Sequence, residues 1–144
     1  MENFEYKKLV HCEQDYNNWF VVNWCLGNTC NYTCSYCPKA LHDGSNPWPD
    51  VEVIKEFILK VKTQHPNKKF YFEFTGGEVT LYKKFIELCE FCKAHDIRVG
   101  MISNGSRPLR WWREHAHLFD HVCLSFHPER ASPNRYLEVA KILE

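Results

Sequence analysis

The sequence of 144 residues lacks a net charge, because its 18 Lys and Arg residues balance its 18 Asp and Glu residues. It therefore has no basic excess that would favour a nucleic-acid partner. It also lacks a long apolar run, since the polar residues 1–6 lead into neither a signal peptide nor a membrane span. We expect a cytoplasmic protein with no membrane partner and no evident nucleic-acid partner.

A disulfide framework is not needed either, although the chain has eight cysteines. A chain of this length can build a stable core without such bonds. In a reducing compartment, clustered cysteines are more often metal ligands than disulfides. Cys30, Cys34 and Cys37 form such a cluster, with the spacing Cys-x3-Cys-x2-Cys directly after an apolar run. This cysteine loop (residues 30–37) predicts a metal centre.

Apolar patterns along the chain predict four strands, each followed by a helix. The strands are expected at residues 19–26, 69–74, 97–102 and 121–126. The helices are expected to begin near Asp50, Thr80, Pro108 and Ser132. Alternating strands and helices predict an α/β fold with a parallel sheet and right-handed crossovers. Residues 19–144 would form this domain, and residues 1–18 an N-terminal extension.

Polar or glycine-rich clusters follow the four predicted strands, at residues 30–37, 75–78, 103–106 and 125–129. In folds of this kind, the ligand site lies beyond the carboxyl ends of the strands. We therefore expect these clusters to converge on one site.

The predicted strands are too few for the sheet to close into a complete barrel. Four strand–helix units are too few to close a (β/α) barrel, and the last apolar helical period reaches Glu144 without a C-cap. The sequence therefore favours a partial (β/α) barrel, truncated relative to a longer protein, over a half-barrel that is open by design.

The cysteine loop also lacks a fourth thiol, which a ferredoxin-type site would supply. Three thiolates would hold three irons of a 4Fe–4S cluster and leave the fourth iron open to a substrate or cofactor. Zinc is the alternative, with Cys25 available as a fourth ligand. Otherwise Cys25, Cys89, Cys92 and Cys123 are expected to pack as small apolar side chains, and Cys12 is uninformative.

The loop, with Tyr36 directly before Cys37, resembles the signature of the radical S-adenosylmethionine (radical SAM) superfamily. Gly76-Gly77-Glu78, after the second strand, resembles the Gly-Gly-Glu motif of that family. The resemblance extends over about residues 19–144, and it implies a partial parallel (β/α) barrel of the radical SAM type. With both motifs in register, the residues favour the iron–sulfur cluster over zinc.

The resemblance implies an enzyme that binds a 4Fe–4S cluster through Cys30, Cys34 and Cys37 and also binds S-adenosylmethionine. Reductive cleavage would give a 5′-deoxyadenosyl radical, which would abstract a hydrogen atom from an unknown substrate. The implied partner is an electron donor such as flavodoxin or ferredoxin.

The resemblance also implies a set of residues that bind S-adenosylmethionine. Tyr36 would pack near the adenine, Gly76 and Gly77 would let the backbone approach the methionyl amine, and Glu78 would support that loop. Asn104 and Ser125 are expected at the methionyl end and at the ribose.

Period-two alternation places Asn23, Glu73, Ser125 and His127 on the interior side of the sheet. His127 is the best candidate for a substrate-side residue. Two other interpretations stay open: a non-catalytic iron–sulfur or zinc-binding module, and an inactive N-terminal fragment of a longer radical SAM protein.

Overall fold

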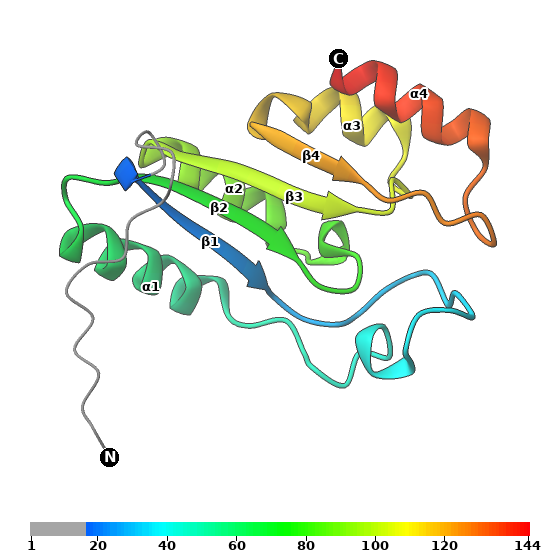
Figure 1. Cartoon of the computed structure of the whole chain (residues 1–144), viewed down its shortest axis with the longest axis horizontal. Helices are drawn as coiled ribbons and strands as arrows, with labels where there is room; N and C mark the ends of the chain where they lie inside the picture. Colours follow the sequence, from blue (N-terminus) through cyan, green and yellow to red (C-terminus); the bar gives the residue numbers. More distant parts are fainter. Residues whose placement is uncertain (1–16) are drawn as a thin grey trace.

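The computed structural model describes residues 17–144, so Cys12 and nearly all of the predicted N-terminal extension lie outside the described residues. Four parallel strands form one sheet in the order β1-β2-β3-β4. All four strands point the same way in Figure 1, so their carboxyl ends share one edge. The strands are β1 (Trp19–Cys25), β2 (Lys69–Thr75), β3 (Ile97–Ser103) and β4 (His121–Leu124).

A helix follows each strand along the chain. The α-helices are α1 (Val51–Gln64), α2 (Phe85–Ala94), α3 (Leu109–His115) and α4 (Pro133–Leu143). Short 3₁₀ turns are η2 (Lys39–Leu41), η3 (Val79–Leu81) and η4 (Ala116–Leu118). The predicted partial parallel (β/α) barrel is thereby confirmed. Among the helices of residues 17–144, none combines the length and the apolar character that a membrane span requires.

One face of the sheet is packed against helices because side chains alternate along each strand. Phe70, Phe72 and Phe74 of β2 are all buried, and they join Ile58 of α1 and Leu88 of α2 in one core. Each buried Phe contributes roughly 1.5–3 kcal/mol relative to an exposed one. The intervening residues of β2 are only half-buried, so the opposite face of the sheet is open in the described part of the chain.

The predicted start of α1 is confirmed, but the expected cap at Thr80 is wrong. The Asp50 carboxylate accepts a hydrogen bond from the Glu52 N–H at 2.8 Å and so caps α1. Thr80 lies inside η3, which Glu78 caps, and α2 begins only at Phe85.

Strand β4 ends at Leu124, two residues before its predicted end at Phe126. Pairing continues for one more hydrogen bond, from the Ser125 N–H to the Ser103 carbonyl at 2.8 Å. The chain then turns away at Pro128, which has no N–H to donate. Ser125 and His127 therefore lie in the loop beyond the strand.

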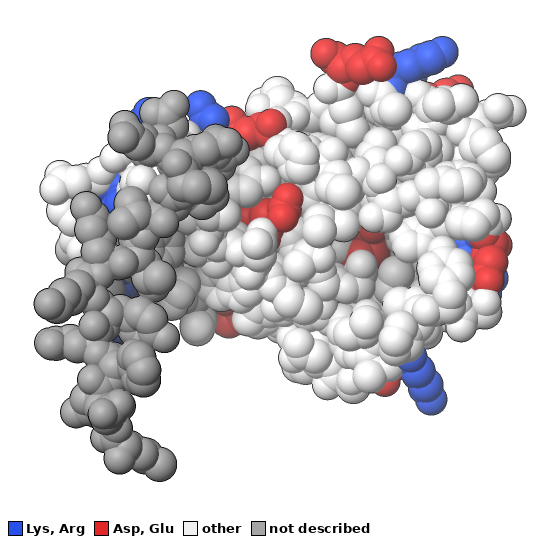
Figure 2. Space-filling model, in the orientation of Figure 1, with Lys and Arg blue, Asp and Glu red and all other residues white. Residues whose placement is uncertain are grey.

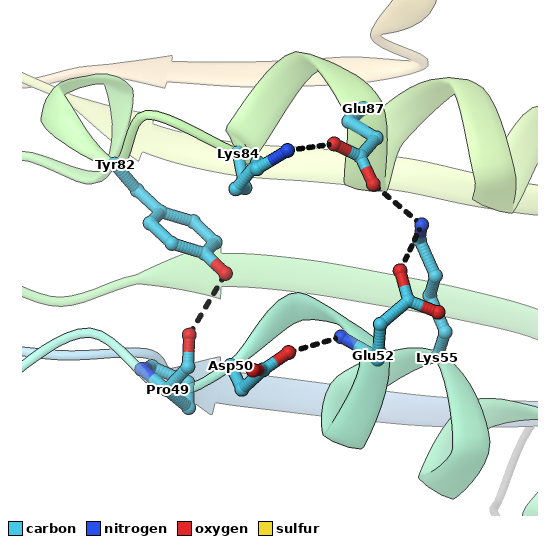
Figure 3. Close-up of polar contacts among 7 residues, drawn as sticks. All are labelled: Pro49, Asp50, Glu52, Lys55, Tyr82, Lys84 and Glu87. Carbon is cyan, nitrogen blue, oxygen red and sulfur yellow. Dashed lines mark hydrogen bonds and ion pairs between the residues drawn. The ribbon is translucent and has the colours of Figure 1, made fainter.

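A polar network joins α1 to α2 at their first turns (Figure 3). The Lys55 ammonium contacts Glu52 at 2.8 Å and Glu87 at 2.6 Å, and Lys84 contacts Glu87 at 2.8 Å. The hydrogen bonds from Lys55 and Lys84 lower the pKa of Glu87 to about 2. Nearby, the Tyr82 hydroxyl donates to the Pro49 carbonyl at 2.8 Å.

We predict that the Glu87 network makes the free energy of unfolding depend on pH in the acidic range. A carboxylate whose folded pKa is lowered stabilises the fold above its ordinary pKa of 4.5, and this contribution is lost as the pH falls toward 2. Urea unfolding near pH 7 and near pH 3 should show a smaller acid-induced loss for Glu87→Gln than for the wild type. Glu56→Gln, at an exposed position of α1, is the control. An equal loss in the Glu87 variant and the wild type would contradict the prediction.

Candidate functional site

An open cavity of about 300 Å³ lies at the carboxyl ends of the strands, where the predicted clusters converge. Figure 2 shows the molecule in the orientation of Figure 1, and the Lys and Arg side chains visible in this view lie mainly near the outline of the molecule. Seven of the residues that line the cavity were expected in the site; they are Cys30, Cys34, Cys37, Gly76, Gly77, Asn104 and Ser125. His127, the predicted substrate-side residue, lines it as well. The strand topology therefore brings most of the expected site together.

The three thiols differ in exposure. Cys34 is buried, whereas Cys30 and Cys37 are half-buried. Burial raises the pKa of the Cys30 thiol, and the hydrogen bond from the Tyr32 N–H, at 3.4 Å from the Cys30 Sγ, partly opposes this shift. A metal would therefore have to displace a proton from Cys30 when it binds.

Thiols are soft donors, which both iron–sulfur clusters and zinc accept as ligands. In residues 17–144, no group of three or more His, Cys, Asp or Glu side chains is arranged to hold one metal ion. Zinc would require its ligands to converge within about 2.3 Å of one point. Cys30, Cys34 and Cys37 line one cavity, and the chemistry of this donor set fits an iron–sulfur cluster.

The packing prediction holds for two of the remaining cysteines and is wrong for two. Cys89 and Cys92 of α2 are fully buried in the core, and burial raises the pKa of Cys92 to about 12. Cys25 and Cys123 are exposed. The alternation of β1 turns Trp24 toward the core and Cys25 toward the cavity, which Cys25 lines.

The Glu78 side chain is fully buried at the end of β2 and connects three strand ends. Its carboxylate accepts hydrogen bonds from the Thr80 hydroxyl at 2.6 Å, the Ser103 hydroxyl at 2.9 Å and the Asn104 N–H at 2.7 Å. The Glu78 N–H donates to the Thr29 carbonyl at 2.9 Å, next to Cys30. Glu78 therefore supports the cysteine loop, while its contact with a cofactor stays a prediction.

The Asn104 side chain contacts the start of the cysteine loop. Its Nδ2 donates to the Asn31 Oδ1 at 3.1 Å and lies 3.8 Å from the Cys30 Sγ. Its Oδ1 accepts from the Ser106 N–H at 3.0 Å. These contacts hold the loop after β3 against Cys30.

Gly76 and Gly77 are required by the chain's own backbone. Both have positive φ, of 111° and 52°. A Cβ atom at Gly76 would lie 2.1 Å from the Gly27 carbonyl oxygen, and one at Gly77 would lie 2.2 Å from the Thr29 carbonyl oxygen. The two glycines thus let the end of β2 approach the segment before Cys30; their approach to a methionyl amine stays a prediction.

His127 lies against the cysteine loop. Its Nδ1 is 2.7 Å from the Tyr36 hydroxyl and 3.7 Å from the Cys34 Sγ. Its ring stacks parallel to Tyr36 at a centroid distance of 6.0 Å and meets Tyr32 edge-on at 5.8 Å. The Tyr36 side chain is otherwise 55% exposed. Contact with a substrate stays a prediction for His127, as contact with adenine does for Tyr36.

Sequence reasoning missed Glu129 and Arg130, which contact Ser35 and Thr33 between the cysteines. The polar run after the fourth strand was recognised as one of the converging clusters, but no spacing rule connects it to a loop more than 90 residues earlier.

Comparisons with known proteins agree with this geometry. The family described as the radical SAM superfamily matches residues 24–141. The sporulation killing factor maturation protein SkfB of Bacillus subtilis (strain 168) is 30% identical over 97 residues. This match covers 67% of the chain and 22% of SkfB, so the chain spans about a fifth of the length of that relative. The family match confirms the resemblance seen in the cysteine and Gly-Gly-Glu motifs.

We predict that a side chain at Gly77 disturbs the cysteine loop. Gly105→Ala is the matched control, because Gly105 also has positive φ (72°) but a Cβ there would be 3.7 Å from its nearest neighbour. The control should lose about 1 kcal/mol of unfolding free energy, from backbone strain alone. Gly77→Ala should lose about 2–4 kcal/mol, because it also pushes on Thr29. Denaturant unfolding measures both, and equal losses would contradict the steric argument.

We predict that Glu78→Gln lowers the unfolding free energy by about 2–3 kcal/mol. Both oxygens of the Glu78 carboxylate accept hydrogen bonds, whereas a glutamine amide has only one oxygen that can accept. Glu90→Gln, at an exposed position of α2, is the control and should change little. A Glu78 variant as stable as this control in urea unfolding would show that the network does not stabilise the strand ends.

Proposed function

Because the chain belongs to the radical SAM superfamily, we propose that it is an enzyme that holds a 4Fe–4S cluster on Cys30, Cys34 and Cys37 and binds S-adenosylmethionine beside it. The observation that carries this proposal is the shared cavity, which three thiols, a glycine pair and polar groups from the strand ends line together. When bound, the cluster and S-adenosylmethionine supply reductive cleavage to a 5′-deoxyadenosyl radical, which abstracts a hydrogen atom from a substrate.

The cysteine loop provides three thiolates and leaves one coordination position without a protein ligand. Cys34 is buried, so its thiolate would hold the centre away from water, while Cys30 and Cys37 are half-buried at the cavity. The Asn104 side-chain amide and the Glu78 backbone N–H keep the loop in place by donating hydrogen bonds to the Asn31 Oδ1 and the Thr29 carbonyl.

The cofactor contacts that we propose come from the cavity wall. Gly76, Gly77 and Ser125 line the same cavity as the three thiols. Since hydrogen bonds to Asn31 and Ser106 occupy the Asn104 amide, it acts mainly by positioning Cys30. The exposed ring of Tyr36 offers an apolar surface near the adenine.

An electron donor such as flavodoxin or ferredoxin would reduce the centre. We place the protein in the cytoplasm, where thiols stay reduced and available to iron. The match covers only 22% of SkfB, so we propose for this chain only the cofactor chemistry of the family.

Anaerobic reconstitution with iron and sulfide tests the proposal. We expect a brown protein whose reduced cluster gives an EPR signal that changes when S-adenosylmethionine is added. A colourless protein that holds one zinc ion tightly would favour the zinc-binding module instead.

We predict that Cys30→Ala, Cys34→Ala and Cys37→Ala each abolish cluster binding, because each removes one of the three thiolates. Cys123→Ala, which removes an exposed thiol from β4, and Cys92→Ala, which removes a buried one from α2, should keep the iron content of the wild type. Iron analysis after reconstitution measures this, and loss of iron in either control would contradict the assignment.

Cys25→Ala separates the two metal interpretations, because Cys25 lines the same cavity and would be the fourth ligand of a zinc site. The cluster requires only three thiolates, so we expect this variant to retain its iron. Loss of the metal in Cys25→Ala would favour a site with four thiolates.

A further inference from the structure

We propose that residues 127–130, directly after β4, form a clamp that holds the cysteine loop in its cluster-binding conformation, with Glu129 as the main positioning residue. This inference rests on the proposed cluster. The contacts of the clamp, in contrast, are present in the chain itself.

The first contact of the clamp joins Glu129 to Ser35, which lies between Cys34 and Cys37. The Glu129 carboxylate accepts from the Ser35 N–H at 2.8 Å and from the Ser35 hydroxyl. Two hydrogen bonds to one carboxylate fix both the backbone and the side chain of Ser35. Hydrogen bonds to a charged acceptor are also stronger than neutral ones.

The second contact joins Arg130 to Thr33, which lies between Cys30 and Cys34. The Arg130 guanidinium donates to the Thr33 carbonyl at 3.0 Å and to the Thr33 hydroxyl at 2.7 Å. The third joins His127 to Tyr36, at 2.7 Å between the Nδ1 and the hydroxyl oxygen. Both intervals between the cysteines are thus held by the segment after β4.

The cysteine loop needs such support because it has little core packing of its own. Thr33, Ser35 and Tyr36 are all exposed, and Cys34 is the buried exception. Fixing an exposed backbone residue costs conformational entropy. Directed hydrogen bonds from a firmly placed neighbour can offset this cost before the metal arrives.

The clamp itself is anchored to the sheet and to α4. The Ser125 N–H donates to the Ser103 carbonyl at 2.8 Å, and the Tyr136 hydroxyl donates to the Leu124 carbonyl at 2.7 Å. The Arg130 N–H donates to the His127 carbonyl at 2.9 Å, which closes a turn. The position of the cysteine loop therefore depends on the end of β4 and the start of α4, more than 90 residues further along the chain.

The first arm of the test uses the full chain without metal and measures hydrogen exchange at the Ser35 amide. We expect Glu129→Ala to speed this exchange by roughly tenfold, because the N–H loses a charged acceptor. Glu129→Gln, which keeps one acceptor oxygen, should fall between Glu129→Ala and the wild type. Glu138→Ala, at an exposed position of α4, is the control and should exchange like the wild type.

The second arm measures the release of iron to a chelator after anaerobic reconstitution. We expect Glu129→Ala and Arg130→Met to lose iron about threefold to tenfold faster than the wild type, and the double variant to lose it faster still. Global thermal unfolding should change little, because the contacts are exposed. If the variants lowered the unfolding temperature and sped iron release in parallel, the cause would be a global loss of stability, which would contradict a local role for the clamp.

Unchanged exchange at Ser35 in Glu129→Ala would overturn the clamp. Faster exchange with unchanged iron release would overturn its role in holding the cluster. A wild-type chain that takes up no iron would overturn the proposed function and with it the purpose of the clamp, while the exchange arm would still report whether the contact exists.

Discussion

The buried carboxylate of Glu78 is the interaction on which the arrangement of the site depends. It accepts hydrogen bonds from the η3 turn and from the end of β3, while its own N–H holds the segment before Cys30. A buried charge is tolerated only where donors surround it, so the loops that supply these donors are constrained to stay together. The carboxyl ends of β1, β2 and β3 are thereby fixed relative to one another before any cofactor is present.

The close approach of these loops explains why glycine occupies positions 76 and 77. The space that a side chain would need is filled by the carbonyl groups of Gly27 and Thr29. A motif that resembles a cofactor-binding sequence thus also serves the packing of the chain on itself. The cysteine loop is then held from two sides, by the end of β2 on one and by the segment after β4 on the other.

Period-two alternation predicted which side of β2 faces the core, and Phe70, Phe72 and Phe74 are buried as expected. Along β1 and β4 the same alternation places Cys25 and Cys123 on the open face, and both are exposed although cysteine is a residue type that is usually buried. The Thr80 cap failed for a different reason. A threonine before an apolar helical period is a good local signal for a helix N-cap. In the structure, however, the Thr80 N–H and hydroxyl both donate hydrogen bonds to the Glu78 carboxylate.

The sequence by itself determined the parallel α/β fold, the family and the three thiols, because periodicity and short motifs are local along the chain. Gly76, Asn104 and Ser125 meet at the cavity because the carboxyl ends of parallel strands lie at one edge of the sheet, as expected from the sequence. Only the tertiary structure decided that Glu129 and Arg130 reach the cysteine loop and that Glu78 is buried at the junction of three strand ends. These contacts join residues that are far apart in sequence. No local pattern specifies such pairs, because the geometry of the folded backbone sets which residues come into contact.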